Sequence, residues 1–160
     1  MPVLKHHDVG GSEITGALKH MYGLVSMSDG QSDYRHYVGL GQTAGTMMTR
    51  VQTPVLNIAD AIWVSQGALE GYPASATTRT NQIVASQDPV ALDWWAARYI
   101  LYPIDNNTRH RPDFAGIEAW LESARSTINA LSGLSDPARG IVVGDVTRTE
   151  SEMELFQTTP

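Results

Sequence analysis

The chain has 160 residues, a length that fits one domain with a core of its own. It carries 11 Lys and Arg residues against 17 Asp and Glu residues, a net charge of −6 without a basic stripe, which argues against a nucleic-acid-binding protein. Cysteine is absent, which excludes disulfides, thiolate zinc sites, cysteine nucleophiles and an iron–sulfur cluster held by this chain.

No apolar stretch of the sequence is long enough to span a membrane, and no signal peptide opens it. We therefore expect a soluble protein without a membrane partner. The cytoplasm is slightly favoured, and an exported form whose leader has been removed is the alternative. Residues 147–160 predict a polar, acidic tail.

The opening residues 2–5 predict a short strand that starts at the very beginning of the chain. Natural domains seldom begin with a core strand, because chain termini are usually loose. We therefore expect the chain to be a fragment of a larger α/β domain whose N-terminal part is missing.

A turn and a helix follow this strand. Residues 8–12 are rich in glycine, and Ser12 is a suitable N-cap for a helix that ends near Tyr22. Apolar residues at helical spacing would form the buried face of this helix: Ile14, Ala17, Leu18 and Met21.

The middle of the chain predicts one helix and one strand. Residues 26–34 are polar and turn-like, and residues 42–51 look weakly helical because glycines interrupt them. Residues 55–64 form an apolar run whose length and β-branched content favour a buried strand of a parallel sheet. Residues 65–81 predict a long loop, since they contain several glycines and a proline.

The last part of the chain predicts two strands, residues 82–86 and 140–146, and two helices. One helix begins at Asp88-Pro89, with a carboxylate at the N-cap, and is stopped by Pro103. The other covers residues 117–131 and is amphipathic. Because strands and helices alternate, we expect a single α/β domain with a mainly parallel sheet and helices packed on it.

The first candidate site lies around the first strand and helix. Lys5 and His7 are two residues apart, so they face the same side of a strand. Thr15 and Lys19 are four residues apart and would share one helix face. We therefore expect two lysines, a histidine and a hydroxyl to line one pocket, with Lys5, His7 and Lys19 as catalytic candidates. A solvated helix face next to a strand end is the alternative.

The glycine-rich turn would complete this site. Gly10, Gly11 and Ser12 lie between a strand end and a helix start, where free backbone N–H groups bind anions. We expect these three residues, with Thr15, to bind a cofactor or ligand whose identity the sequence does not give. The turn does not match a phosphate-binding loop in spacing or in its last residues.

Three acidic residues are further candidates. Asp60 lies inside an apolar strand, where a carboxylate is costly unless it is paired or belongs to a site, so we count it as a fourth catalytic candidate. Its alternative role is a cap of a neighbouring segment. Asp88 is best explained as a helix N-cap, and Asp93 would pair with a basic residue or with Asp60.

Metal binding would depend on histidine and carboxylates. The five histidines have no ligand-like spacing along the chain, so any such site must be assembled from distant segments. The candidate ligands are His7, Asp60 and Asp93.

Three segments together resemble the family called domain of unknown function 362. They are PVLKHHDVGGSEITGALKHMYGLV, LNIADAIWVSQGALEGYP and IVASQDPVALDWWAARYIL, and the resemblance covers residues 1–104. His20 stands where the family has Asn. The resemblance implies an α/β protein of unknown activity, usually with a further α/β stretch before the first segment. It adds weight to the motif positions Lys5, His7, Lys19, Asp60, Asp88 and Asp93.

Three functions stay open at this point. The first is an enzyme or cofactor-binding domain that holds a small anionic ligand between strand ends and a helix N-terminus. The second is a metal-dependent enzyme that uses His7 with Asp60 or Asp93. The third is a non-catalytic binding or assembly module, a homo-oligomer for example, in which the polar motif residues form structural ion pairs.

Overall fold

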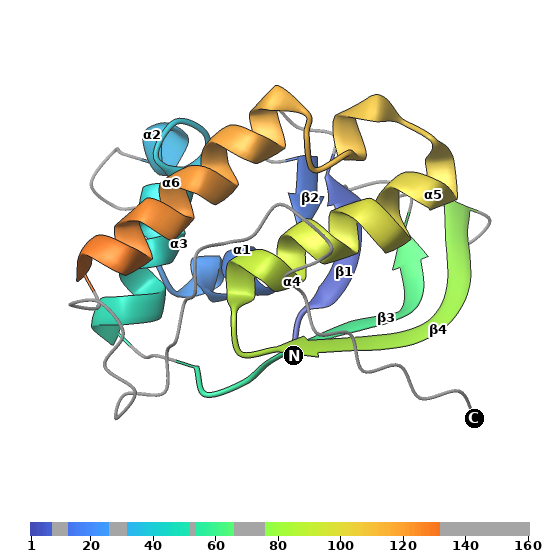
Figure 1. Ribbon diagram of the computed structural model, residues 1–160, viewed down its shortest axis with the longest axis horizontal. Helices are drawn as coiled ribbons and strands as arrows, with labels where there is room; N and C mark the ends of the chain where they lie inside the picture. The colour runs from blue at the N-terminus through green and yellow to red at the C-terminus, as the bar shows by residue number, and fades with distance from the viewer. Residues whose placement is uncertain (8–12, 26–31, 52–53, 66–75, 132–160) are drawn as a thin grey trace.

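The computed structural model describes residues 1–7, 13–25, 32–51, 54–65 and 76–131 (Figure 1). A four-stranded sheet has the order β2-β1-β3-β4. Its strands are β1 (Val3–His7), β2 (Glu13–Thr15), β3 (Asn57–Ser65) and β4 (Thr77–Ser86). Strand β1 is parallel to β3, whereas β2 is antiparallel to β1 and β4 is antiparallel to β3.

The sheet is therefore mostly antiparallel, and the expectation of a mainly parallel sheet is wrong. Residues 66–76 separate β3 from β4. A parallel pair needs a crossover of about a dozen residues or more, whereas an antiparallel pair can be joined by a short connection. The α/β class itself is confirmed, since helices pack on this sheet.

Strand β4 also starts earlier than expected, because residues 77–81 of the predicted loop belong to it. Its register against β3 shifts between Ala61 and Trp63, and Asn81 has a positive φ of 57°. This register shift is typical of a β-bulge, in which an extra residue on one strand is accommodated and the strand continues beyond it. Strand β4 therefore extends through residues that were predicted to form a loop.

The helices follow one another along the chain in three groups. The first is α1 (Ala17–His20) with the 3₁₀ helix η1 (Met21–Leu24), and the second is α2 (Ser32–His36) and α3 (Leu40–Thr46), which the π-helical η2 (Met47–Val51) extends. The third comprises α4 (Pro89–Ala96), the π-helical η4 (Ala97–Leu101), α5 (Tyr102–Asp105), the 3₁₀ helix η5 (Thr108–His110) and α6 (Ala115–Leu131). Within the described ranges, no helix is both long and apolar enough to cross a membrane.

Helix α6 confirms the amphipathic pattern of residues 117–131, and it packs along α3 (Figure 1). The two glycines of α3 face α6 at short range. A Cβ atom at Gly41 would lie 2.8 Å from the backbone nitrogen of Ala124, and one at Gly45 would lie 2.9 Å from the Ala124 carbonyl oxygen. These glycines therefore allow close helix packing.

Two expected helix boundaries are wrong. Residues 13–15 form β2 rather than the first helical turn, and α1 begins only at Ala17. Pro103 does not stop the helix after Asp88: it lies just after the junction of the π-helical η4 with α5, and the helical stretch continues through it to Asp105. The helical stretch ends at Asn106, which is left-handed with φ 54°.

Several predictions fall on residues that the structure does not describe. They are the glycine-rich turn of residues 8–12, most of the turn at 26–34, the loop residues 66–75, the strand at 140–146 and the acidic tail.

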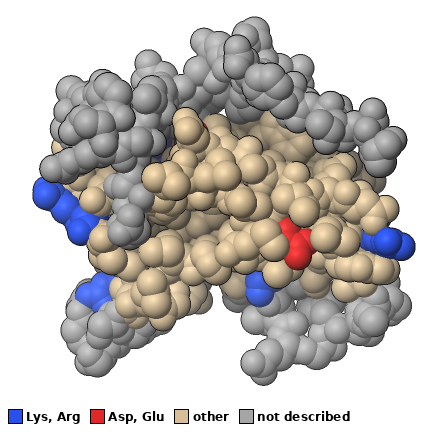
Figure 2. Space-filling view, turned by 90° about the horizontal axis from the view of Figure 1, so that it is seen from below, with Lys and Arg blue, Asp and Glu red and all other residues tan. Residues whose placement is uncertain are grey.

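The two faces of the sheet differ in their cover. In β1, Leu4 and His6 are fully buried, whereas Val3 on the opposite side is 55% exposed. Ile83 is 60% exposed, and it lies in line with Val3 because both pair with the same residue of β3. Figure 2, which views the molecule from the side where β3 and β4 lie in Figure 1, shows few charged residues among the described ones.

Candidate functional site

A cavity of about 390 Å³, which we call the lysine cavity, lies at the end of β1, beside β2 and α1. The structure brings four of the sequence-derived candidates to its wall: Lys5, His7, Thr15 and Lys19. The rest of the described lining comes mainly from η1 and α2 and includes Tyr22 and His36. Lys5 and Lys19 are the two lysines of the chain, so all of its lysine side chains meet here.

Strand pairing, rather than a helix face, brings these residues together. Lys5 and Thr15 are directly opposite each other in the antiparallel β1–β2 pair, and directly opposite residues of such a pair point to the same side. Lys19 follows within one turn of helix, in α1. The sequence placed Thr15 and Lys19 on one helix, but the two residues belong to a strand and a helix that meet.

The Lys19 ammonium group lies in an unfavourable place for a cation. The residue is only 9% exposed. Burial, and to a smaller extent repulsion from Lys5, together lower its pKa from 10.5 to about 8. The cavity therefore concentrates positive charge in a partly desolvated space.

Two hydroxyl groups add hydrogen-bonding capacity. The Thr15 hydroxyl oxygen is buried and has no hydrogen-bond partner among the described residues. The Tyr22 hydroxyl is likewise buried without a hydrogen-bond partner among the described residues, and burial raises its pKa while the nearby Arg35 acts in the opposite direction. The Thr15 hydroxyl therefore has unused hydrogen-bonding capacity in the wall of the cavity.

The N-terminus of α1 is closed by Asp93 of α4. Its carboxylate accepts hydrogen bonds from the backbone N–H groups of Ala17, at 2.6 Å, and Leu18, at 3.1 Å. Asp93 is fully buried, and burial raises the pKa of its carboxyl group to about 7 against the lowering effect of these hydrogen bonds. Asp93 therefore caps α1 instead of pairing with a basic residue or with Asp60, as had been expected. The two N–H groups that it occupies are not free to bind an external anion.

The other acidic candidates have local roles. Asp88 is the N-cap of α4, as predicted, and accepts hydrogen bonds from Val90 N at 2.8 Å and Ala91 N at 3.0 Å. Asp60 accepts a hydrogen bond from Ile62 N of its own strand at 2.8 Å, and it does not line the lysine cavity. Gly10, Gly11 and Ser12 lie outside the described residues.

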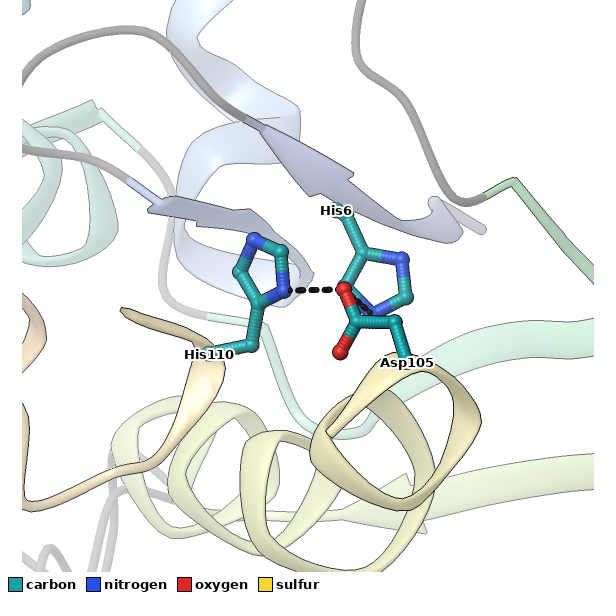
Figure 3. A group of neighbouring side chains, drawn as sticks. All are labelled: His6, Asp105 and His110. Atoms are coloured by element: carbon teal, nitrogen blue, oxygen red, sulfur yellow. Dashed lines mark hydrogen bonds and ion pairs between the residues drawn. The ribbon is translucent and has the colours of Figure 1, made fainter. Parts of the chain in front are cut away.

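A second polar cluster lies on the opposite face of β1 (Figure 3). It consists of His6, Asp105 and His110, which each place one ligand atom within 4.8 Å of the other two. Within the part of the chain that the structure describes, these three residues form the group of side chains that could hold a metal ion. The earlier candidates His7, Asp60 and Asp93 form no such group there. The sequence signal for this cluster is weak, since Asp105 and His110 are five residues apart and His6 is almost a hundred residues away.

Residues 1–98 match the profile of a protein family described as Domain of unknown function (DUF362). The chain belongs to this family. The whole described lysine cavity lies within the DUF362 match, whereas Asp105 and His110 lie beyond it. No curated protein and no solved structure matches the chain. Membership of DUF362 therefore supports the resemblance of the three sequence segments and assigns no reaction.

Proposed function

We propose that the lysine cavity binds a small anionic ligand. The observation that carries this proposal is the placement of Lys5 beside a largely buried Lys19, close enough for Lys5 to lower the pKa of Lys19. Like charges that are held together in a partly desolvated space repel each other, so an anion between them is favoured.

The size and lining of the cavity suit such a ligand. A volume of about 390 Å³ is in the range of small-molecule sites. Lys5 and Lys19 would supply charge, and the Thr15 hydroxyl would donate a hydrogen bond to an oxygen of the ligand. His7 is the further group at the wall that can donate a hydrogen bond or move a proton.

The low pKa of Lys19 adds a chemical option. An amine with a pKa of about 8 is partly neutral near pH 7 to 8, where an ordinary lysine is fully charged. A neutral amine can accept a proton or attack a carbonyl carbon. If the protein is an enzyme, Lys19 is therefore the group that we expect to act on the substrate.

Calorimetric titration of the full chain with inorganic phosphate and with acetate tests the proposal. We expect binding of at least one of these anions, weakened about tenfold or more in Lys5→Met and in Lys19→Met, since loss of a charged hydrogen-bond partner costs about 1.5–3 kcal/mol. Arg98→Met is the matched control, because Arg98 is exposed and lies outside the cavity lining. Equal binding by all four proteins would refute the site.

A binding or assembly module is the second candidate, and the open face of the sheet favours it. Val3, Trp63 and Ile83 are all more than half exposed, and exposed apolar residues in a group mark interaction surfaces. Sedimentation of the chain and of Trp63→Ser at several concentrations tests this function. Self-association that Trp63→Ser removes would support it, and two monomeric proteins would count against a homo-oligomer.

The two candidates also differ in what Lys19 does for stability. A structural ion pair predicts that Lys19→Met lowers the free energy of unfolding, because loss of one partner of a buried pair costs about 3–5 kcal/mol. A ligand-binding cation predicts no loss, or a gain of about 0.5–2 kcal/mol, since site residues are often poor for stability. Chemical denaturation near pH 7 separates these results.

A further inference from the structure

The strongest unassigned feature is the cluster of His6, Asp105 and His110, which ties the sheet to the end of the long helical stretch (Figure 3). His6 comes from β1, Asp105 is the last residue of α5, and His110 is the last residue of η5. Both histidines are fully buried, and the Asp105 side chain is 18% exposed. Polar groups at this depth must satisfy one another or bind something.

Both ring nitrogens of His6 face hydrogen-bond acceptors. Nδ1 lies 2.8 Å from the carbonyl oxygen of Ser65, and since a carbonyl only accepts, a proton on Nδ1 satisfies this contact. A neutral imidazole has one N–H, so Nε2 then presents a lone pair. Yet Nε2 lies 2.8 Å from the carbonyl oxygen of Leu101 and 3.7 Å from Asp105 Oδ2. Three electron-rich atoms then converge, and either a proton on Nε2 or a metal cation between them relieves their repulsion.

The Asp105 carboxylate is held in a fixed orientation toward the two histidines. Its Oδ1 accepts a hydrogen bond from Asn107 N at 2.9 Å, which leaves Oδ2 turned toward the histidines. Oδ2 lies 2.8 Å from Nδ1 of His110. The chain reverses around this carboxylate because Asn106 is left-handed, which brings His110 back onto the cluster. The rings of His6 and His110 are 4.2 Å apart, centroid to centroid.

We propose that His6, Asp105 and His110 bind a divalent transition-metal ion, zinc by preference, through Nε2, Oδ2 and Nδ1. Imidazole and carboxylate are zinc ligands at about 2.0–2.2 Å, so neighbouring ligand atoms of a tetrahedral shell lie roughly 3.3 Å apart. The observed separations of 3.7 Å and 2.8 Å from Asp105 Oδ2 bracket that value. The Leu101 carbonyl oxygen, 2.8 Å from His6 Nε2, is a further oxygen donor beside the cluster.

The outer contacts have the form that metal sites use. A histidine ligand usually donates its other ring N–H to a carbonyl or carboxylate, and a carboxylate ligand is itself hydrogen-bonded. His6 does the first through Ser65, and Asp105 does the second through Asn107. Because both histidines are fully buried, the site is closed and its role is structural. It would join β1 to α5 and η5.

The competing occupant of the cluster is a proton on His6 Nε2, which would make an imidazolium beside the Asp105 carboxylate. Titration of the full, untagged chain with Co²⁺, followed by visible absorption, separates the two. We expect one equivalent of Co²⁺ with a visible band that Zn²⁺ displaces, and a melting temperature that rises with Zn²⁺ concentration. No band and no shift in the wild-type chain would show that the cluster holds a proton and would overturn the proposal.

Three substitutions test whether the metal binds at this cluster. His6→Gln and His110→Gln should each weaken Co²⁺ binding by more than the roughly 10- to 100-fold that loss of an outer contact causes. His20→Gln is the matched control, since His20 is exposed and outside the cluster. Binding of equal strength in His110→Gln and in the control would place the metal elsewhere and refute the assignment. The lysine cavity has its own test, so the two sites can fail separately.

Discussion

Gly16 lies directly against the carboxylate of Asp93. A Cβ atom at residue 16 would be 2.7 Å from Asp93 Cγ, well inside contact distance. Because Gly16 has no side chain, the Asp93 carboxylate of α4 can reach the first N–H groups of α1, at Ala17 and Leu18. Because Lys19 follows within the same short helix, the contact between Gly16 and Asp93 also positions the lysine cavity.

Gly16→Ala should lower the free energy of unfolding by about 1–3 kcal/mol, the usual cost of forcing an extra methyl group into a packed site. Urea denaturation measures it. Gly23→Ala is the matched control, because a Cβ atom at Gly23 would meet nothing within 4 Å. Equal stability of Gly16→Ala and Gly23→Ala would show that Asp93 can move away without cost.

Asp93 should make stability depend on pH in a defined window. Its pKa is about 7 in the folded protein against an ordinary value of 3.8, so between these values the folded state binds more protons than the unfolded state. The stabilising contribution of the protonated Asp93 is therefore lost as the pH rises from about 4 to about 7.

Asp93→Asn cannot ionise, and it should flatten this part of the profile of unfolding free energy against pH. Denaturation midpoints at several pH values between 4 and 8 provide the measurement. Asp113→Asn is a suitable control, since Asp113 is exposed at the surface. An unchanged slope in Asp93→Asn would mean that the carboxyl group titrates normally.

Lys5→Met should raise the pKa of Lys19 from about 8 toward 10.5 without reaching it. Repulsion from Lys5 is the second cause of the lowered pKa, and burial, the first cause, stays in place. Carbon-13 NMR of the lysine side chain follows the titration, and Lys19 is then the single lysine of the chain. A pKa of Lys19 that does not move would show that the two ammonium groups do not interact.

Asp88→Ala should cost about 1 kcal/mol, because it removes the hydrogen bonds from the side chain to Val90 N and Ala91 N at the start of α4. Asp88→Ser keeps an N-cap oxygen and should lose much less. Thermal unfolding of the two variants beside the wild-type protein makes the comparison. Equal losses would show that the charge of Asp88, rather than its cap, stabilises the helix.

The sequence by itself determined the features that depend on neighbouring residues. The cap by Asp88, the amphipathic helix at residues 117–131 and the shared side of Lys5 and His7 all follow from local spacing. Backbone geometry sets these periods whatever the rest of the chain does. A strand was also predicted where β3 lies, but the prediction that it is buried throughout is wrong, because buried and more exposed residues alternate along β3.

Only the tertiary structure decided the rest, because it depends on which distant segments meet. Residues 13–15 have a helical apolar pattern but gain more by pairing with β1, so Thr15 reached the cavity on a strand. The direction of β4 depends on its pairing with β3, which local spacing does not encode. Asp93 caps a helix more than seventy residues earlier in the chain, and His6 meets Asp105 across almost a hundred residues. Burial of the whole core offsets the loss of chain entropy that such long-range contacts require. No short stretch of the sequence contains both partners of such a contact.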